Sequence, residues 1–404
     1  MARVQLEIPY DTIQIDQREI AQSVLNIEKK NRSNPFAWNG QFSPQFIEAL
    51  LEQYAEHHFT VADPFAGSGT VLYECAQKNI SAVGCELNPS AYYMAKIYEL
   101  CQLNKEQRLD LVQSIDERLL FLIMKRNSLD SVLDIARNDP SPLIRDVVSL
   151  LVVLMDLYNH TFSNDLLFDK WRKLVCIIQS LPYSRCNVRA MLGDARRLSI
   201  SANEIDLIIT SPPYINVFNY HQKYRRSVES LGYDVLQIAR NEIGANRKNR
   251  GNRYLTVIEY CIDMSFAMRE MMRIAKPNAR MILVVGRESN VLSTAFSNSE
   301  LIYELAYGVL GFPLILKQQR VFKNKFGQMI YEDILHFSNS KFSQKMLSDE
   351  ALKELSRLTA MRALLEKLNA LDDANKNFPL LRAAIDNAQS VTASEERQVH
   401  GHSW

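Results

Sequence analysis

The sequence predicts an α/β fold in which helices cover both faces of a doubly wound, mainly parallel sheet. Apolar runs of strand length alternate with segments of helical periodicity in both halves of the chain. Two short strings, one rich in Gly and one rich in Pro, each follow such an apolar run. The 404 residues, of which 47% are hydrophobic and 23% charged, are enough to bury the core of one large or two ordinary domains.

The N-terminal part is expected to lead into this sheet. Residues 1–58 predict a strand, then a helix over 17–30, then a second helix over 45–54. Ser43 is the expected N-cap of the second helix, because Pro44 suits the first helical position.

The sheet itself begins at Phe59. From there the pattern predicts a strand, a Gly-rich loop, a helix over 71–78, a strand over 81–85, an acidic turn and a helix over 90–101. This β-α-β-α order is typical of the start of a doubly wound sheet, and the first expected domain spans 1–101.

Residues 102–185 interrupt the sheet. Apolar residues recur there at helical spacing, from Leu109 to Ile123 and again from Ile144 to Leu157, which predicts an insertion of several helices. Two interpretations stay open for the insertion: an added structural subdomain, or a part in recognising the substrate.

The remaining expected domains are the second half of the sheet, 186–340, and a helical tail, 341–404. Leu repeats at helical spacing in the tail between 348 and 370, so we expect it to pack on the core or on a second subunit. The second half of the sheet is expected to contain strands at 188–192, 205–209 and 280–285, a helix over 257–274, and a closing antiparallel hairpin of 312–322 with 332–337.

Composition excludes several classes of protein. The six cysteines show no C-x-x-C spacing, so we expect neither a zinc ribbon nor a disulfide framework, and a reducing, cytoplasmic location. The N-terminus lacks the pattern of a signal peptide, and no apolar run is long enough to span a membrane. Because the net charge is only +1, any contact with nucleic acid must come from local basic patches.

The Gly-rich string runs from Asp63 to Thr70 and reads F-x-G-x-G from Phe65 onward. Its glycines would let a ligand lie against the strand end below a helix N-terminus. The loop is shorter than the dinucleotide fingerprint and lacks the Gly-Lys-Ser/Thr of a P-loop, which disfavours a pyrophosphate ligand. Glu86 ends the next strand, where a carboxylate can accept both hydroxyls of a ribose. The sequence therefore predicts an adenosine-containing ligand.

Two aspartates follow strand ends near this loop. Asp194 could accept a hydrogen bond from an adenine amino group, and Asp63 could meet an ammonium group. The alternative for each is an aspartate that caps a helix or a turn, and this alternative stays open.

The Pro-rich string, Ser211-Pro212-Pro213-Tyr214, follows the buried strand 205–209. Ligands of open α/β folds bind at this carboxyl edge of the sheet. Consecutive prolines hold the backbone extended, so its carbonyl groups stay available as acceptors. A simple Pro-Pro turn with a buried tyrosine is the alternative interpretation.

Together the two strings resemble S-adenosylmethionine-dependent DNA amino-methyltransferases, the N4-cytosine and N6-adenine family of the SPPY type. The resemblance covers 34–100 and 188–337 and implies a Rossmann-like methyltransferase sheet that binds S-adenosyl-L-methionine. The residues it implies for this cofactor, besides Asp63, Glu86 and Asp194, are Phe65, Ala66, Gly67, Ser68, Gly69 and Thr70, with Phe42 and Ser43 from a looser match of 34–44.

The resemblance also implies how an exocyclic amine of a base is methylated. The Ser211 hydroxyl and the Pro212 carbonyl would accept both amino hydrogens and favour a tetrahedral nitrogen, while Tyr214 stacks on a base that has left the duplex. N6-adenine members usually carry Asp or Asn where Ser211 stands, so the serine favours N4 of cytosine. The absence of any Pro-Cys dipeptide excludes a C5-cytosine methyltransferase, and the chemistry needs no metal.

A basic stretch follows the second string. Between His221 and Tyr254 there are eight Lys or Arg against three acidic residues, and the segment 244–252 has the Gly and Asn content of a mobile loop. Beside a base pocket this pattern predicts a grip on DNA phosphates, and an ordinary solvated charge run is the alternative. The candidates for DNA binding are Arg225, Arg226, Arg247, Lys248, Arg250 and Arg253.

The order of the two strings excludes the circularly permuted class, and we expect target recognition in the 102–185 insertion, the 215–255 loop, or both. The predicted function is a site-specific methyltransferase acting on double-stranded DNA, as a monomer or a dimer, in a restriction-modification system with a separately encoded endonuclease. Three alternatives stay open: an N6-adenine DNA methyltransferase, a tRNA guanine-N2 methyltransferase, and a methyltransferase-like DNA-binding protein without turnover.

Overall fold

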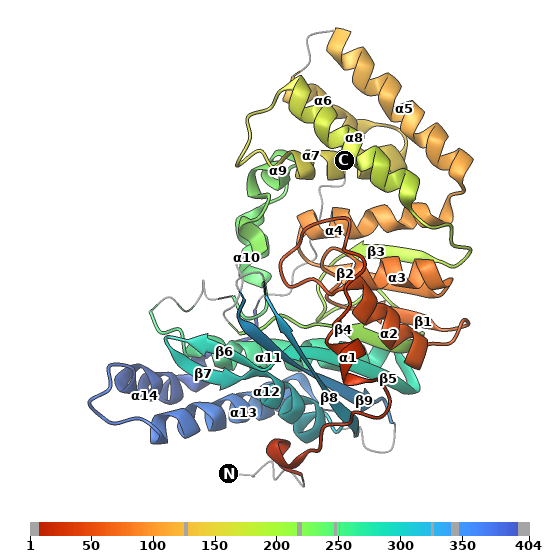
Figure 1. Ribbon diagram of the computed structural model, residues 1–404. Coiled ribbons are helices and arrows are strands. Elements are labelled where there is room, and N and C mark those ends of the chain that lie inside the picture. Colours follow the sequence, from red (N-terminus) through yellow and green to blue (C-terminus); the bar gives the residue numbers. More distant parts are fainter. Residues whose placement is uncertain are drawn as a thin grey trace.

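The computed structural model describes residues 8–124, 128–215, 220–245, 249, 251–324, 327–340 and 347–394 (Figure 1). A sheet of seven strands runs through its centre in the order β3-β2-β1-β4-β5-β9-β8. Five of these strands are parallel, and β9 and β8 close the sheet as an antiparallel hairpin. The strands are β1 Thr60–Asp63, β2 Ser81–Glu86, β3 Val188–Leu192, β4 Ile205–Thr210, β5 Ala275–Gly286, β8 Leu314–Lys323 and β9 Met329–Ser338.

The strand order reverses between β1 and β4. From β1 the chain adds β2 and β3 on one side, and it then returns to add β4 and β5 on the other. In doubly wound sheets such a switch point opens a crevice at the carboxyl ends of the strands. Asp63 and Thr210 end the two strands here, so the Gly-rich and Pro-rich strings meet at this crevice. The predicted fold class is confirmed.

Both faces of the sheet are covered, as a parallel sheet requires. Successive residues of β4 show this, because Leu207 and Ile209 belong to one buried cluster and Ile208 to the other. The first cluster includes α2 Pro44–Tyr54, α3 Thr70–Lys78 and α4 Pro89–Lys96, which is continued by a 3-10 turn, Ile97–Gln102. The second includes α11 Leu255–Ile274, α12 Asn298–Tyr303, α13 Asp349–Asn369 and α14 Phe378–Asp386.

The prediction of a helix over 17–30 is wrong. Only Gln22–Leu25 is helical (α1). The Asp16 carboxylate accepts hydrogen bonds from the backbone N–H groups of Arg18 and Glu19, which holds the chain in a turn. Ile27 then takes a left-handed φ of 55° and ends the helix. The Asn26 side chain accepts from the Val321 N–H of β8, so tertiary contacts set this segment.

Residues 105–180 contain four helices, which lie beyond the β3 edge of the sheet beside α4 (Figure 1). The serines before α6, α7 and α8 accept hydrogen bonds from backbone N–H groups of the first turn, as good N-caps do. Helix α7 packs against α6, α8 and α4 and joins the insertion to the sheet domain. The helices are α5 Lys105–Met124, α6 Leu129–Asn138, α7 Pro142–Met155 and α8 Asn164–Ser180.

Three shorter elements lie after the Pro-rich string. Helices α9 Arg225–Ser230 and α10 Val235–Asn241 run from the insertion toward the sheet (Figure 1). A small hairpin, β6 Glu288–Val291 with β7 Thr294–Ser297, follows β5. Within the described ranges, none of the helices combines the length and the apolar character that crossing a membrane requires.

Candidate active site

The Gly-rich loop turns sharply between β1 and α3. Gly67 and Gly69 have φ angles of +52° and +85°, which side chains rarely adopt. A Cβ atom at Gly69 would lie 2.8 Å from the Ala95 Cα and 2.9 Å from the Tyr98 ring, so α4 can pack closely only against a glycine here. The loop therefore keeps its backbone open toward the crevice at the start of α3.

Glu86 joins this loop to the neighbouring strand. Its carboxylate accepts hydrogen bonds of 2.8 Å from the backbone N–H groups of Gly67 and Asn88. Burial raises the pKa of Glu86 to about 7, and the nearby Asp63 and Glu242 act in the same direction. The carboxylate is thus held in place at the end of β2, and it titrates near neutral pH.

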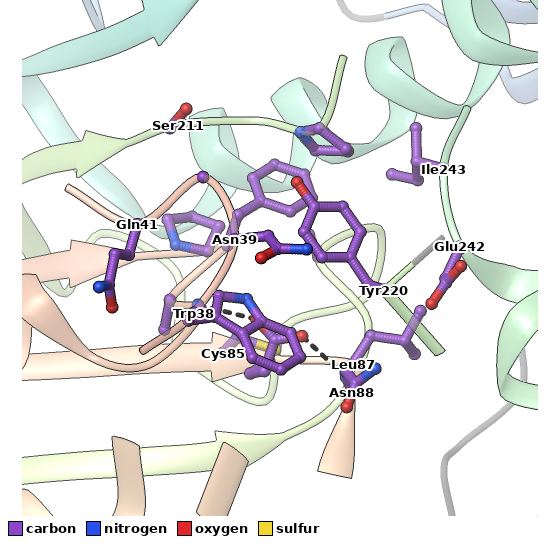
Figure 2. Close-up of a pocket in the computed structure, with 18 of the residues that line it drawn as sticks. Trp38, Asn39, Gln41, Cys85, Leu87, Asn88, Ser211, Tyr220, Glu242 and Ile243 are labelled. Atoms are coloured by element: carbon purple, nitrogen blue, oxygen red, sulfur yellow. Dashed lines mark hydrogen bonds between the residues drawn. The ribbon is translucent and has the colours of Figure 1, made fainter. Parts of the chain in front are cut away.

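A cavity of about 900 Å³, partly open to solvent, lies above these strand ends (Figure 2). The Trp38 and Tyr220 rings stack on each other at 6.0 Å and 19° and form part of its wall. The cavity is lined by Trp38, Asn39, Gly40, Gln41, Phe42, Pro64, Phe65, Ala66, Gly67, Thr70, Cys85, Glu86, Leu87, Asn88, Gly193, Asp194, Ala195, Ser211, Pro213, Tyr220, Asn241, Glu242 and Ile243.

The two candidate aspartates have different positions. Asp194 lines the cavity, and Arg196 holds its carboxylate through the side-chain Nε and Nη2 atoms and the backbone N–H. Asp63 is 2% exposed and is not among the residues that line the cavity. It accepts hydrogen bonds from the Thr210 hydroxyl (2.6 Å) and the Phe65 N–H (3.1 Å) and so ties β1 to β4. Burial raises the pKa of Asp63 to about 7.

The N-terminal segment 34–44 is fastened to the loop by side chains. The Ser68 hydroxyl donates to the Gln41 Oε1 at 2.7 Å, and the Thr70 hydroxyl donates to the Asn34 Oδ1 at 3.1 Å. These contacts place Phe42 on the cavity wall, whereas Ser43 lines a second hollow next to it. Ser68 itself faces Gln41 and is buried.

Ser211 lies where two hollows meet. It lines the cavity described above and also a wider, open hollow of about 2930 Å³. Pro213 lines only the cavity, and Tyr214 lines only the open hollow. The Pro-rich string thus places one hydroxyl at the junction and one aromatic ring on the outer side.

The Tyr214 ring packs closely against the end of β5. A Cβ atom at Gly286 would come within 2.6 Å of the ring, so the contact depends on a glycine at this position. The Tyr214 hydroxyl donates to the Glu332 carboxylate of β9 at 3.4 Å. Burial raises the pKa of Tyr214 well above its ordinary value, which keeps the phenol protonated.

The candidate DNA-binding cations are only partly placed. Arg225 pairs with Glu229 at 2.7 Å, and the Arg226 guanidinium lies 5.5 Å from the Tyr158 ring centre. Neither of these two, nor the half-buried Arg253, is among the residues that line the two hollows. Arg247, Lys248 and Arg250 lie outside the described residues.

The sequence analysis missed several residues of the cavity wall. Trp38 and Gln41 lie within the segment 34–44, of which only Phe42 and Ser43 were predicted to bind the cofactor. The aromatic residue and the glycine of Trp38-Asn39-Gly40 could have indicated a ligand contact there. Tyr220 and Glu242 offered no such signal, because they reach the cavity only through the folding of distant segments.

Comparisons with known proteins can now be set beside this geometry. The sequence model of a family described as DNA methylase matches residues 10–97, which include the Gly-rich loop and Glu86. The Type II methyltransferase M.AvaI of Nostoc sp. is 21% identical over 291 residues, which are 54% of this chain and 59% of that protein. M.MjaII, a Type II methyltransferase of Methanocaldococcus jannaschii, is 31% identical over 72 residues, 17% of this chain and 14% of that protein.

The chain thus spans about three fifths of the length of M.AvaI. Among solved structures, a SAM-dependent methyltransferase of Methanosarcina mazei is 11% identical with a TM-score of 0.35 and covers 72% of this chain and 97% of its own. Over residues 10–97 the chain is therefore similar to the DNA methylase family.

Proposed function

We propose that the protein transfers a methyl group from S-adenosyl-L-methionine to the exocyclic amino group of a base flipped out of DNA, with N4 of cytosine as the target. The position of Ser211 carries this proposal. Ser211 lines both the cavity and the wider hollow next to it, so one residue can reach a ligand in each. A transfer between two ligands requires such a shared boundary.

The cavity fits the cofactor on three counts. Gly67 lies on the cavity wall with a left-handed φ, so the loop brings backbone without a side chain to the ligand, and Gly69 lets α4 pack closely behind the loop. Glu86 presents carboxylate oxygens at the end of β2, where ribose hydroxyls can donate to them. Trp38 and Tyr220 supply flat apolar surface for the nucleoside. S-Adenosyl-L-methionine would supply an electrophilic methyl group on a positively charged sulfur.

The Pro-rich string would prepare the amine. An exocyclic amino nitrogen is a poor nucleophile because its lone pair is delocalised into the ring. Hydrogen bonds from its two hydrogens to the Ser211 hydroxyl and the Pro212 carbonyl favour a tetrahedral nitrogen and localise the lone pair. Tyr214, which packs against Gly286 and donates a hydrogen bond to Glu332, gives the base a ring to stack on.

Two finer assignments belong to the same proposal. Serine at position 211 resembles the N4-cytosine members, which supports cytosine as the base. The relatives M.AvaI and M.MjaII are named Type II methyltransferases, which supports a place in a restriction-modification system with a separate endonuclease.

The helical insertion is proposed to contribute to target recognition. Its α6 residue Arg137 donates to the backbone carbonyl of Ser230, and the Ser227 hydroxyl accepts from the N–H of Leu157. The insertion is therefore anchored to α9, which follows the Pro-rich string in the chain.

Ser211→Ala tests the role of the junction residue. We expect the turnover of DNA methylation to fall by about 100-fold or more, as when one transition-state hydrogen bond is removed from an active site. The cofactor affinity, measured by calorimetry, should stay within about twofold. Ser201→Ala, at an exposed position outside both hollows, is the matched control. Wild-type turnover in Ser211→Ala would refute the proposed mechanism.

A further inference from the structure

The open hollow beside Ser211 has one wall that the function above does not use. This wall, the hairpin wall, is formed by the facing ends of β8 and β9 and by the turn from β5 to β6. Residues of the N-terminal segment from Asn26 to Pro44 also line the hollow. Ser211 and Tyr214 line the same hollow, so whatever occupies it lies beside the proposed base site.

The hairpin wall carries positive charge on an aromatic support. The Arg287 guanidinium lies 5.1 Å from the centre of the Tyr331 ring, and the Arg320 guanidinium lies 4.4 Å from that of Phe322. Lys323 adds a third, exposed cation to the wall, and Lys30 of the N-terminal segment lines the same hollow. Within the part of the chain that the structure describes, Lys30 and Lys323 form no ion pair.

The hollow is therefore positively charged overall. Its four cations, Lys30, Arg287, Arg320 and Lys323, face two acidic residues, Glu288 and Glu332. Arg320 lies near Glu332 and Arg287 pairs with Asp333, so the two lysines are the charges left for an anionic ligand.

The same wall exposes apolar and aromatic surface. Tyr331 is 43% exposed and Met329 is 45% exposed, although both lie on a strand of the main sheet. Exposed rings next to cations are typical of surfaces that bind nucleic acid, because rings stack on bases while cations bind phosphates.

We infer that the hollow holds the DNA strand that carries the target base, with phosphates at Lys30 and Lys323 and a neighbouring nucleotide against Tyr331. The inference rests on the proposed function and names the surface that delivers the base to Ser211. It places strand binding on the closing hairpin, which the sequence analysis regarded only as an end to the sheet.

The test measures DNA binding directly, without turnover. Random-sequence duplex DNA and S-adenosyl-L-homocysteine are added to the full chain, and the dissociation constant is followed against salt concentration. Lys30→Glu with Lys323→Glu should raise the dissociation constant at least tenfold and reduce the log–log salt slope by about 2, because two phosphate contacts are lost. Tyr331→Ala should raise the dissociation constant about tenfold, within the range of one base stack.

Lys376→Glu with Arg382→Glu is the charge-matched control, because both residues are exposed and lie near α14, outside the hollow. If the Lys30/Lys323 variant and the control have equal affinity for DNA and equal salt slopes, this inference is overturned, but the proposed function is not. A wild-type protein that fails to bind DNA would instead refute the proposed function.

Discussion

Replacing Glu86 by Gln tests whether this carboxylate holds the ribose of the cofactor. In the free protein Glu86 accepts two backbone hydrogen bonds, and burial raises its pKa to about 7. Ribose hydroxyls donate hydrogen bonds, so cofactor binding favours the ionised carboxylate and lowers the pKa of Glu86 in the complex. Affinity should therefore rise as the pH increases through 7.

The size of the effect follows from the pKa. With a value of about 7, roughly a tenth of the Glu86 side chains are ionised at pH 6 and roughly nine tenths at pH 8. The cofactor dissociation constant should fall about tenfold between these pH values, which corresponds to about 1.4 kcal/mol. Glu86→Gln cannot ionise, so its affinity should be nearly independent of pH. At pH 8 the variant should bind about tenfold more weakly, because it lacks charge-assisted hydrogen bonds.

Calorimetric titration with S-adenosyl-L-homocysteine between pH 6 and 8 measures both effects. Asp63→Asn is the matched control, because burial also raises the pKa of Asp63 to about 7 but its side chain does not line the cavity. This control should still bind more tightly as the pH rises, although the change should lie at a lower pH, because the Asp63 charge no longer raises the pKa of Glu86. A wild-type affinity that does not change with pH, or a Glu86→Gln variant that keeps the tenfold change, would refute the assignment of Glu86.

Three other substitutions test the loop, the cavity wall and the base platform. Gly69→Ala should lower the free energy of unfolding by about 2–4 kcal/mol in urea titrations, because the φ of +85° and the 2.8 Å approach to Ala95 both oppose a side chain. Gly251→Ala is the control, because a Cβ atom there would lie in open space. Equal stability of the two variants would contradict the packing described for Gly69. Trp38→Ala should weaken cofactor binding about tenfold in calorimetry, because it removes the ring that stacks on Tyr220. Tyr158→Ala, which removes an exposed ring, is the control and should not change the affinity. Wild-type cofactor affinity in Trp38→Ala would show that Trp38 is not part of the site. Gly286→Ala should reduce DNA methylation at least tenfold at unchanged cofactor affinity, because its Cβ displaces Tyr214. Wild-type turnover in Gly286→Ala would show that the Tyr214 position is unimportant.

Much of the sheet could be predicted because its strands are short apolar runs bounded by polar turns. The strand expected over 188–192 has these bounds in the structure, and the strand expected over 205–209 extends by one residue to Thr210. The helix expected over 17–30 failed for a tertiary reason. The Asp16 side chain accepts a backbone hydrogen bond in a local turn, and the Asn26 side chain accepts one from β8. The periodicity of apolar residues cannot show these contacts.

The candidate site divides in the same way. Gly67 and Ser211 line the cavity and lie in short strings whose chemistry is local, so the sequence could indicate them, whereas Gly69 packs against α4. The Trp38 and Tyr220 pair depends on two segments that are far apart in the chain and are also joined by Lys223, whose ammonium donates to the Ala37 carbonyl. Asp63 was expected at the ligand, but its hydrogen bond to Thr210 places it beneath the loop, and only the structure shows this.

The most direct test of the central claim is a mass-spectrometric analysis of nucleosides from DNA and RNA after incubation with labelled S-adenosyl-L-methionine. The account predicts labelled N4-methylcytosine in DNA, and none with Ser211→Ala. Labelled N6-methyladenine in DNA would correct the base while keeping the reaction. Label found only in RNA, or no label in any base, would contradict the account.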